Sequence, residues 1–125
     1  MNEPLLYEAE SYAIRGAVYE VYKILGNGYL EEVYQSALEE ELRLRNIPFQ
    51  AKKQLRAVYK GRDCGIYIPD VICYDKIILE LKAVELLHEK HRAQLMNSLK
   101  MTGLKLGMLV NFGAYPKVSI VRIAN

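Results

Sequence analysis

The sequence predicts an α/β (α+β) fold in which a mixed central sheet is flanked by helices. Two observations predict it. Apolar residues at helical spacing alternate with short β-branched and aromatic runs, in the order two helices, three strands, one helix and two strands. In addition, a chain of 125 residues with 51% hydrophobic and 26% charged residues suits one folded core. We therefore expect a single domain over residues 1–125.

Helices are expected over residues 5–25 and 30–45, where apolar side chains recur three and four positions apart. The sequence Gly-Asn-Gly at 26–28 ends the first helix, and Asn-Ile-Pro at 46–48 ends the second. A third helix is expected over residues 89–102, and Gly103 directly after it marks its end.

Strands are expected over residues 49–59, 66–73, 77–84, 106–112 and 118–123, which are rich in β-branched, aromatic and other apolar residues. A Tyr-Asp-Lys loop joins the second strand to the third as a hairpin. The third strand is nearly all apolar, so we expect it to be buried on both faces. The two charged residues inside it therefore need an explanation.

These two residues, Glu80 and Lys82, lie on one face of the strand because side chains alternate between faces. A three-residue hairpin loop pairs Cys73 with Ile77, which places Asp70 opposite Glu80 on the same face. Two carboxylates whose Cβ atoms are about 5 Å apart repel each other unless a cation lies between them. Mg²⁺ takes oxygen ligands and keeps several waters, and Lys82 would orient such a water.

Two alternatives remain open for this group. Asp70, Lys82 and Glu80 form an ion cluster without function, since buried charges are usually paired, or the hairpin is slipped by one residue. If no metal is bound, Lys82 neutralises the two acids only in part. We then expect the metal-free fold to be less stable near neutral pH, and Asp70→Asn to melt higher than wild type in EDTA.

Glu31 is a further candidate, because it follows Gly28 closely at the start of the second helix. Glu31 and Tyr34 are three residues apart and share a helix face, whereas Glu32 lies about 100° away. The alternative is that Glu31 only suits the helix dipole.

Four motifs occur in a fixed order: Gly28-x-x-Glu31-x-x-Tyr34, Pro69-Asp70, Glu80-Leu81-Lys82, and Gln94 on the following helix. Their order and spacing resemble the GxxExxY protein family of the PD-(D/E)XK nuclease superfamily, over about residues 14–125. Gln94 resembles the Gln of a Q-x-x-x-Y motif, whose Tyr position is Ser98 here.

The resemblance implies a restriction-endonuclease-like αβββαβ core with an extra N-terminal helix. It implies that Asp70, Glu80, Glu31 and the backbone carbonyl of Leu81 hold Mg²⁺ or Mn²⁺. It also implies that Lys82 is catalytic together with the three acids.

The charge distribution favours a nucleic acid as the partner. Residues 1–41 have a net charge of −7, residues 42–62 carry seven cations and no acid, and residues 63–125 have a net charge of +2. A basic stretch is typical of a nucleic-acid footprint, although it is also typical of a solvated face that pairs with acidic helices. Candidate contacts are Gln94, Lys52, Lys53, Arg56, Arg62, Lys100 and Tyr34.

The sequence thus predicts a metal-dependent nuclease that hydrolyses phosphodiester bonds, with DNA favoured over RNA. The alternatives are a non-catalytic nucleic-acid-binding or interaction module on the same fold, and a resolvase-like homodimer with a larger footprint. No stretch approaches about 18 apolar residues, so we expect no membrane contact. Two cysteines without zinc-finger spacing, and an N-terminus without a basic start, indicate reduced thiols in the cytoplasm.

Overall fold

The computed structural model describes residues 5–125, which begin with two helices that pack on each other. Helix α1 runs over Glu8–Leu25 and α2 over Glu31–Leu44. The first helix starts three residues later than expected, because Tyr7 has the left-handed backbone conformation (φ 54°) and stands before its first turn. The second matches its expected bounds within one residue at each end.

A five-stranded sheet forms the centre of the molecule, in the order β1-β4-β5-β6-β7. Strands β5 and β6 are parallel and all other neighbours are antiparallel, so the predicted mixed sheet is confirmed. Helix α3 makes the crossover between the two parallel strands. The bounds are β1 Phe49–Ala51, β4 Val71–Cys73, β5 Ile77–Lys82, α3 Glu89–Thr102, β6 Leu106–Asn111 and β7 Ser119–Ala124.

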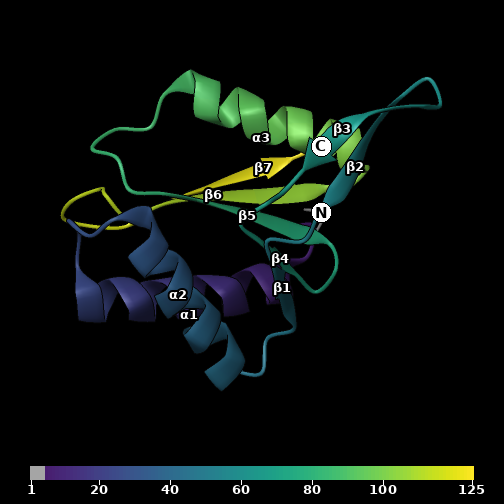
Figure 1. The fold of residues 1–125 in the computed structure, drawn as a ribbon. Coiled ribbons are helices and arrows are strands. Elements are labelled where there is room, and N and C mark those ends of the chain that lie inside the picture. The colour runs from purple at the N-terminus through teal and green to yellow at the C-terminus, as the bar shows by residue number, and fades with distance from the viewer. Residues whose placement is uncertain (1–4) are drawn as a thin grey trace, which may run out of the picture.

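The helices cover both faces of this sheet, as Figure 1 shows, with α1 and α2 on one side and α3 on the other. Leu79 and Leu81 of β5 belong to the larger core against α1 and α2. Ile78 belongs to the smaller core against α3, together with Leu95 and Leu99. The expectation that this strand is buried on both faces is therefore confirmed, and Glu80 and Lys82 fall on the α3 side.

Two expected strands are each split in the structure. The run 49–59 forms β1 and then β2 (Leu55–Tyr59), because Lys52 has a left-handed backbone (φ 54°) that ends β1. The run 66–73 divides between β3 (Arg62–Tyr67) and β4, with irregular backbone around Pro69. Proline has no N–H to donate to a ladder, which is a physical reason for this second break.

Strands β2 and β3 pair only with each other, as an antiparallel hairpin outside the central sheet. Figure 1 shows this hairpin extending away from the sheet beside one end of α3. Its two-residue turn, Lys60-Gly61, has positive φ at both positions (48° and 83°). These angles are those of a type I′ turn, whose twist matches that of the flanking strands.

The hairpin of β4 and β5 has the predicted register. Cys73 pairs with Ile77 and Val71 pairs with Leu79, so the alternative of a slip by one residue is excluded. The ladder stops there, one position short of the expected pair of Asp70 and Glu80.

Two further expectations concern the environment of the chain. Within residues 5–125, no helix has both the length and the apolar character needed to cross a membrane. Cys64 is exposed and Cys73 is buried, and both are free thiols.

Candidate functional site

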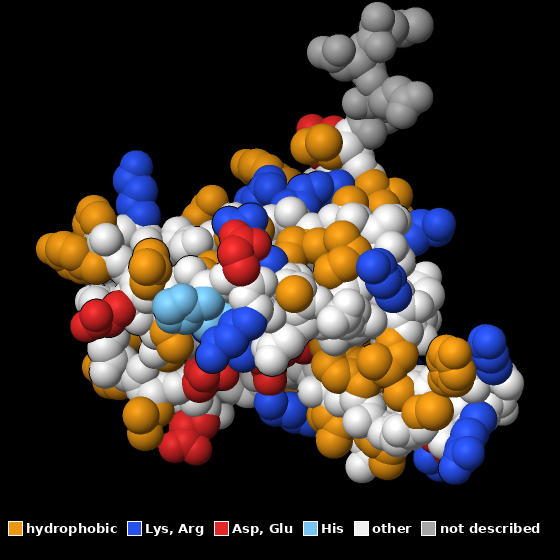
Figure 2. Space-filling model, turned by 90° about the horizontal axis from the view of Figure 1, so that it is seen from above, with side chains coloured by type: hydrophobic (Ala, Val, Ile, Leu, Met, Phe, Trp, Pro, Cys, Tyr) orange, Lys and Arg blue, Asp and Glu red, His pale blue; other side chains and the backbone are white. Residues whose placement is uncertain are grey.

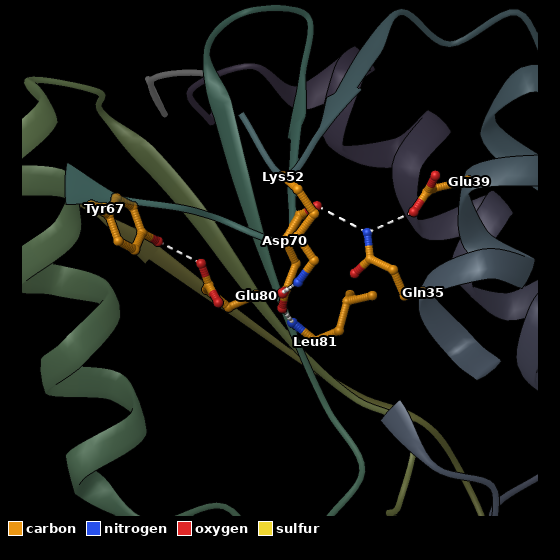
Figure 3. A network of polar contacts seen from close by, with 7 residues as sticks. All are labelled: Gln35, Glu39, Lys52, Tyr67, Asp70, Glu80 and Leu81. Atoms are coloured by element: carbon orange, nitrogen blue, oxygen red, sulfur yellow. Dashed lines mark hydrogen bonds and ion pairs between the residues drawn. The ribbon is translucent and has the colours of Figure 1, made fainter. Parts of the chain in front are cut away.

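Asp70 lies directly before β4, and its carboxylate bridges two parts of the chain (Figure 3). Oδ1 accepts a hydrogen bond from Nζ of Lys52 at 2.5 Å, and Oδ2 accepts one from the backbone N–H of Leu81 at 2.7 Å. The side chain is only 14% exposed. The β4–β5 ladder ends just before this point, so the Asp70 carboxylate, and not a backbone carbonyl of β4, accepts the hydrogen bond of the Leu81 N–H.

Glu80 lies on the α3 side of β5 and contacts the β2–β3 hairpin. Its Oε1 accepts a hydrogen bond from the hydroxyl of Tyr67 at 2.5 Å, as Figure 3 shows. Burial raises the pKa of the Glu80 carboxyl to about 7, and the nearby charge of Asp70 adds to this rise. The Tyr67 hydrogen bond and the charge of Lys82 act in the opposite direction without cancelling it.

Two cavities flank β5 at this point. One, of about 320 Å³, lies under α3 and is lined by Glu80, Lys82, Tyr67 and Gln94. The other, of about 220 Å³, lies beside α2 and is lined by the remaining predicted site residues: Glu31, Asp70 and Leu81, with Glu32, Gln35 and Lys52. The structure thus brings the residues predicted for catalysis and for the metal to one stretch of β5, but divides them between its two sides.

The acidic side chains are close enough to interact but are not gathered into a preformed cluster. The pKa of Lys52 is raised, mainly by its hydrogen bond to Asp70, and the charges of Glu80 and Glu31 contribute. Over residues 5–125, however, no three His, Cys, Asp or Glu side chains converge as they would around a bound ion. The negative charge of Asp70 and Glu80 is therefore balanced by Lys52 as well as by Lys82.

Gln35 supplies an observation that bears on a metal ion. Its amide nitrogen donates hydrogen bonds to the carbonyl of Asp70 and to Glu39, both at 2.9 Å, which fixes the orientation of the amide. Its Oε1 is buried and has no hydrogen-bond partner. A buried acceptor without a partner, in a cavity lined by Glu31 and Asp70, suits a cation or its water. The donor set consists of hard oxygen atoms and fits Mg²⁺ or Mn²⁺.

Tyr67 and Gln35 were not predicted from the sequence. Gln35 is four residues after Glu31 and therefore shares its helix face, so the signal was present. Tyr67 had no such signal, because its contact with Glu80 depends on the irregular backbone around Pro69, which separates β3 from β4.

Tyr34 was expected among the nucleic-acid contacts, and this prediction is wrong. Its side chain is completely buried, and its ring stacks on Phe112 with centroids 4.5 Å apart. Its hydroxyl donates to the carbonyl of Gly26 at 2.5 Å and accepts the N–H of Tyr29 at 3.3 Å. Tyr34 therefore holds the α1–α2 loop and has no surface to offer a ligand.

The other candidate contacts lie around the hairpin and α3. Lys53 and Arg56 line a third cavity, of about 620 Å³, between the hairpin and the end of α3. Arg56 also pairs with Asp63 at 2.7 Å. Arg62 begins β3 at the hairpin turn, and Lys100 is exposed in the last turn of α3.

The comparisons with known proteins agree with this geometry. Residues 8–123 match the PD-(D/E)XK nuclease superfamily, and the chain belongs to that superfamily. The crystal structure of SSO0001 has a similar fold, with a TM-score of 0.56 and 21% sequence identity. The similarity covers 95% of this chain but only 60% of the SSO0001 chain. No curated protein matches the sequence.

Proposed function

We propose that this chain is a metal-dependent nuclease of the GxxExxY family that hydrolyses phosphodiester bonds in DNA in the cytoplasm. One observation carries the proposal. In a PD-(D/E)XK superfamily chain, Asp70 accepts a hydrogen bond from the N–H of Leu81, the residue after Glu80 on β5, and Lys82 lines the same cavity as Glu80.

The residues have separate tasks in this proposal. Asp70, Glu80, Glu31 and the Leu81 carbonyl hold Mg²⁺ or Mn²⁺. When bound, such an ion supplies Lewis-acid polarisation of the phosphate and a water of lowered pKa. Lys82 orients the attacking water, or stabilises the charge that develops on the phosphate oxygens.

Binding of the ion requires changes in the present contacts. Both oxygens of Asp70 are already hydrogen-bonded, one to the Lys52 side chain and one to a backbone N–H. Lys52 is more than half exposed and flexible, so it can release Oδ1 toward an ion and turn to a phosphate. Glu80 must also lose its proton, which the charge of an ion promotes.

The same contacts favour a second candidate function, a non-catalytic nucleic-acid-binding module. The Lys52–Asp70 ion pair satisfies the acid without a metal, and no three acidic side chains converge over residues 5–125. In this case the basic residues would bind a nucleic acid that the chain does not cut.

One assay separates the two functions. Purified protein is incubated with single-stranded, duplex and branched DNA and with RNA, in Mg²⁺, Mn²⁺ or EDTA. The nuclease proposal expects cleavage in metal only, lost in Glu80→Ala and Lys82→Ala while most nucleic-acid binding remains. Lys117→Ala, at an exposed lysine elsewhere, is the matched control and should retain cleavage. Binding without cleavage by the wild type would support the module.

A further inference from the structure

The β2–β3 hairpin exposes apolar side chains that nothing else within residues 5–125 fully covers. Val58, Tyr59 and Ile66 are 54%, 64% and 52% exposed, and Ile68 directly after β3 is 45% exposed. The hairpin lies at the lower right of Figure 2, where hydrophobic and basic side chains gather together. An exposed apolar patch of this kind marks an interaction surface.

The charges of the hairpin show which kind of partner it fits. Arg56 and Asp63 neutralise each other through their ion pair at 2.7 Å. Lys60 and Arg62 remain at the turn, and neither has an acidic partner within residues 5–125. The tip is therefore cationic, which suits a polyanion and disfavours contact with the same patch of a second copy.

Tyr59 adds an aromatic ring next to these two cations, since it precedes Lys60 and pairs with Arg62 across the hairpin. Nζ of Lys60 lies 5.5 Å from the centroid of the Tyr59 ring, so the lysine covers one face of the ring. The strand pair Tyr59–Arg62 closes the hairpin next to the rigid type I′ turn. An exposed ring beside cations is the arrangement on which unpaired bases stack, since a base inside a duplex has both faces covered by its neighbours.

The base of the same hairpin contacts the candidate site. Tyr67, at the end of β3, donates its hydroxyl to Glu80. Five residue steps separate Tyr67 from Arg62, which at about 3.3 Å per residue is an arm of about 17 Å. A strand bound at β5 could therefore reach the hairpin tip within a few nucleotides.

We propose that the hairpin tip binds an unpaired segment of the nucleic acid, with Tyr59 stacking on a base and Lys60 and Arg62 contacting phosphates. This inference rests on the proposed function and adds the substrate class, a nucleic acid with a single-stranded segment. The hairpin then acts as an arm that selects such substrates and directs them to β5.

The test measures binding in EDTA, so that it does not depend on cleavage. Fluorescence anisotropy compares a short single-stranded DNA with the same sequence as a blunt duplex. Tyr59→Ala should weaken single-strand binding by about tenfold, the effect of losing one stacked base, and change duplex binding less than about twofold. Tyr59→Phe, which keeps the ring, should bind like the wild type.

Tyr12→Ala is the matched control, because Tyr12 is 78% exposed on α1 and should not affect either DNA. A fluorescent base analogue in the single strand should be quenched by wild type and not by Tyr59→Ala. Equal affinity of Tyr59→Ala and wild type for the single strand, or an equal loss for both DNAs, would overturn the inference. So would a dimer in size-exclusion chromatography that Tyr59→Ala converts to monomer, since the patch would then bind protein. Cleavage by wild type together with any of these results would leave the nuclease proposal standing.

Discussion

At the scale of single residues, the Glu80 carboxyl links the site to stability. Its pKa rises from 4.5 to about 7 in the fold, mainly because it is buried. Between these values the folded state binds more protons than the unfolded state, so the free energy of unfolding falls as pH rises. The stabilising effect is complete below about pH 4.5 and is lost as pH passes about 7.

Glu80→Gln removes this titration and keeps an oxygen that accepts the Tyr67 hydrogen bond. In EDTA near pH 8 we expect the variant to be more stable than wild type by roughly 1–3 kcal/mol, with little difference near pH 4. Urea unfolding of both proteins at pH 4 and pH 8 measures this difference in the free energy of unfolding. Glu85→Gln, at an exposed acid nearby, should show no pH-dependent gain. A stability difference that is the same at both pH values would contradict the account.

The Tyr67 hydroxyl should act through Glu80, as a positioning group. Tyr67→Phe removes a hydrogen bond that lowers the pKa of the Glu80 carboxyl, so that pKa should rise further in the variant. The acidic limb of the kcat pH profile should move to higher pH, with KM for DNA unchanged. Tyr59→Phe is the control on the same hairpin. A raised KM with an unmoved pH profile would indicate that Tyr67 only packs the hairpin.

The sequence could indicate some of these residues but not others. Alternation along β5 and the register of its hairpin were sufficient to place Glu80 and Lys82 on one face and Asp70 beside the same strand, but not to show that Asp70 lines a separate cavity. The Lys52–Asp70 ion pair was not foreseeable, because it depends on the left-handed turn at Lys52 that ends β1. That turn has no marker such as glycine.

At the scale of elements, the α1–α2 loop explains the spacing of Gly28, Glu31 and Tyr34. Gly28 has a φ of 110°, which residues with a side chain rarely adopt. The turn it allows lets α2 start at Glu31 and places Tyr34 under the loop, where its hydroxyl meets Gly26. The hydrogen bond from Tyr34 to the loop fixes the start of α2, and Glu31 in its first turn lines the same cavity as Asp70.

Tyr34→Phe should therefore lower stability, by about 1 kcal/mol, because the Gly26 carbonyl and the Tyr29 N–H lose a partner while the ring packing stays. Denaturant unfolding measures the change. Tyr12→Phe, at an exposed ring of α1, should change stability by less than about 0.5 kcal/mol. An unchanged midpoint for Tyr34→Phe would mean that water replaces the hydroxyl without loss.

Most elements follow from periodicity, and the exceptions have a common cause. The helices, β5, β6 and β7 match their expected positions within a few residues, because each buries a regular apolar face. The separate hairpin of β2 and β3 could not be predicted in this way, since its strands are largely exposed and bury no apolar face against the core. Its only strong local signal is the Lys60-Gly61 turn.

At the scale of the whole molecule, a bound metal ion should stabilise the fold by linkage. An ion that binds only the folded state adds about 2.7 kcal/mol when its concentration is 100 times its dissociation constant. For a domain of this size we expect roughly a 10 °C rise in Tm. The relief of repulsion between Asp70 and Glu80 contributes to this gain.

Asp70→Asn tests this linkage, and the structure reverses the expectation drawn from sequence. Wild-type Asp70 holds Lys52 and the Leu81 N–H with a full negative charge, and Asn weakens both contacts. The variant should therefore melt below wild type in EDTA, not above it, despite the lower repulsion near Glu80. It should also gain little from Mg²⁺ or Mn²⁺, because a ligand is lost. Asp75→Asn, in the exposed β4–β5 turn, is the control that should respond to metal like wild type. Thermal unfolding of the three proteins, with EDTA and with each ion, decides the matter: an equal shift in wild type and Asp70→Asn would exclude Asp70 as a ligand.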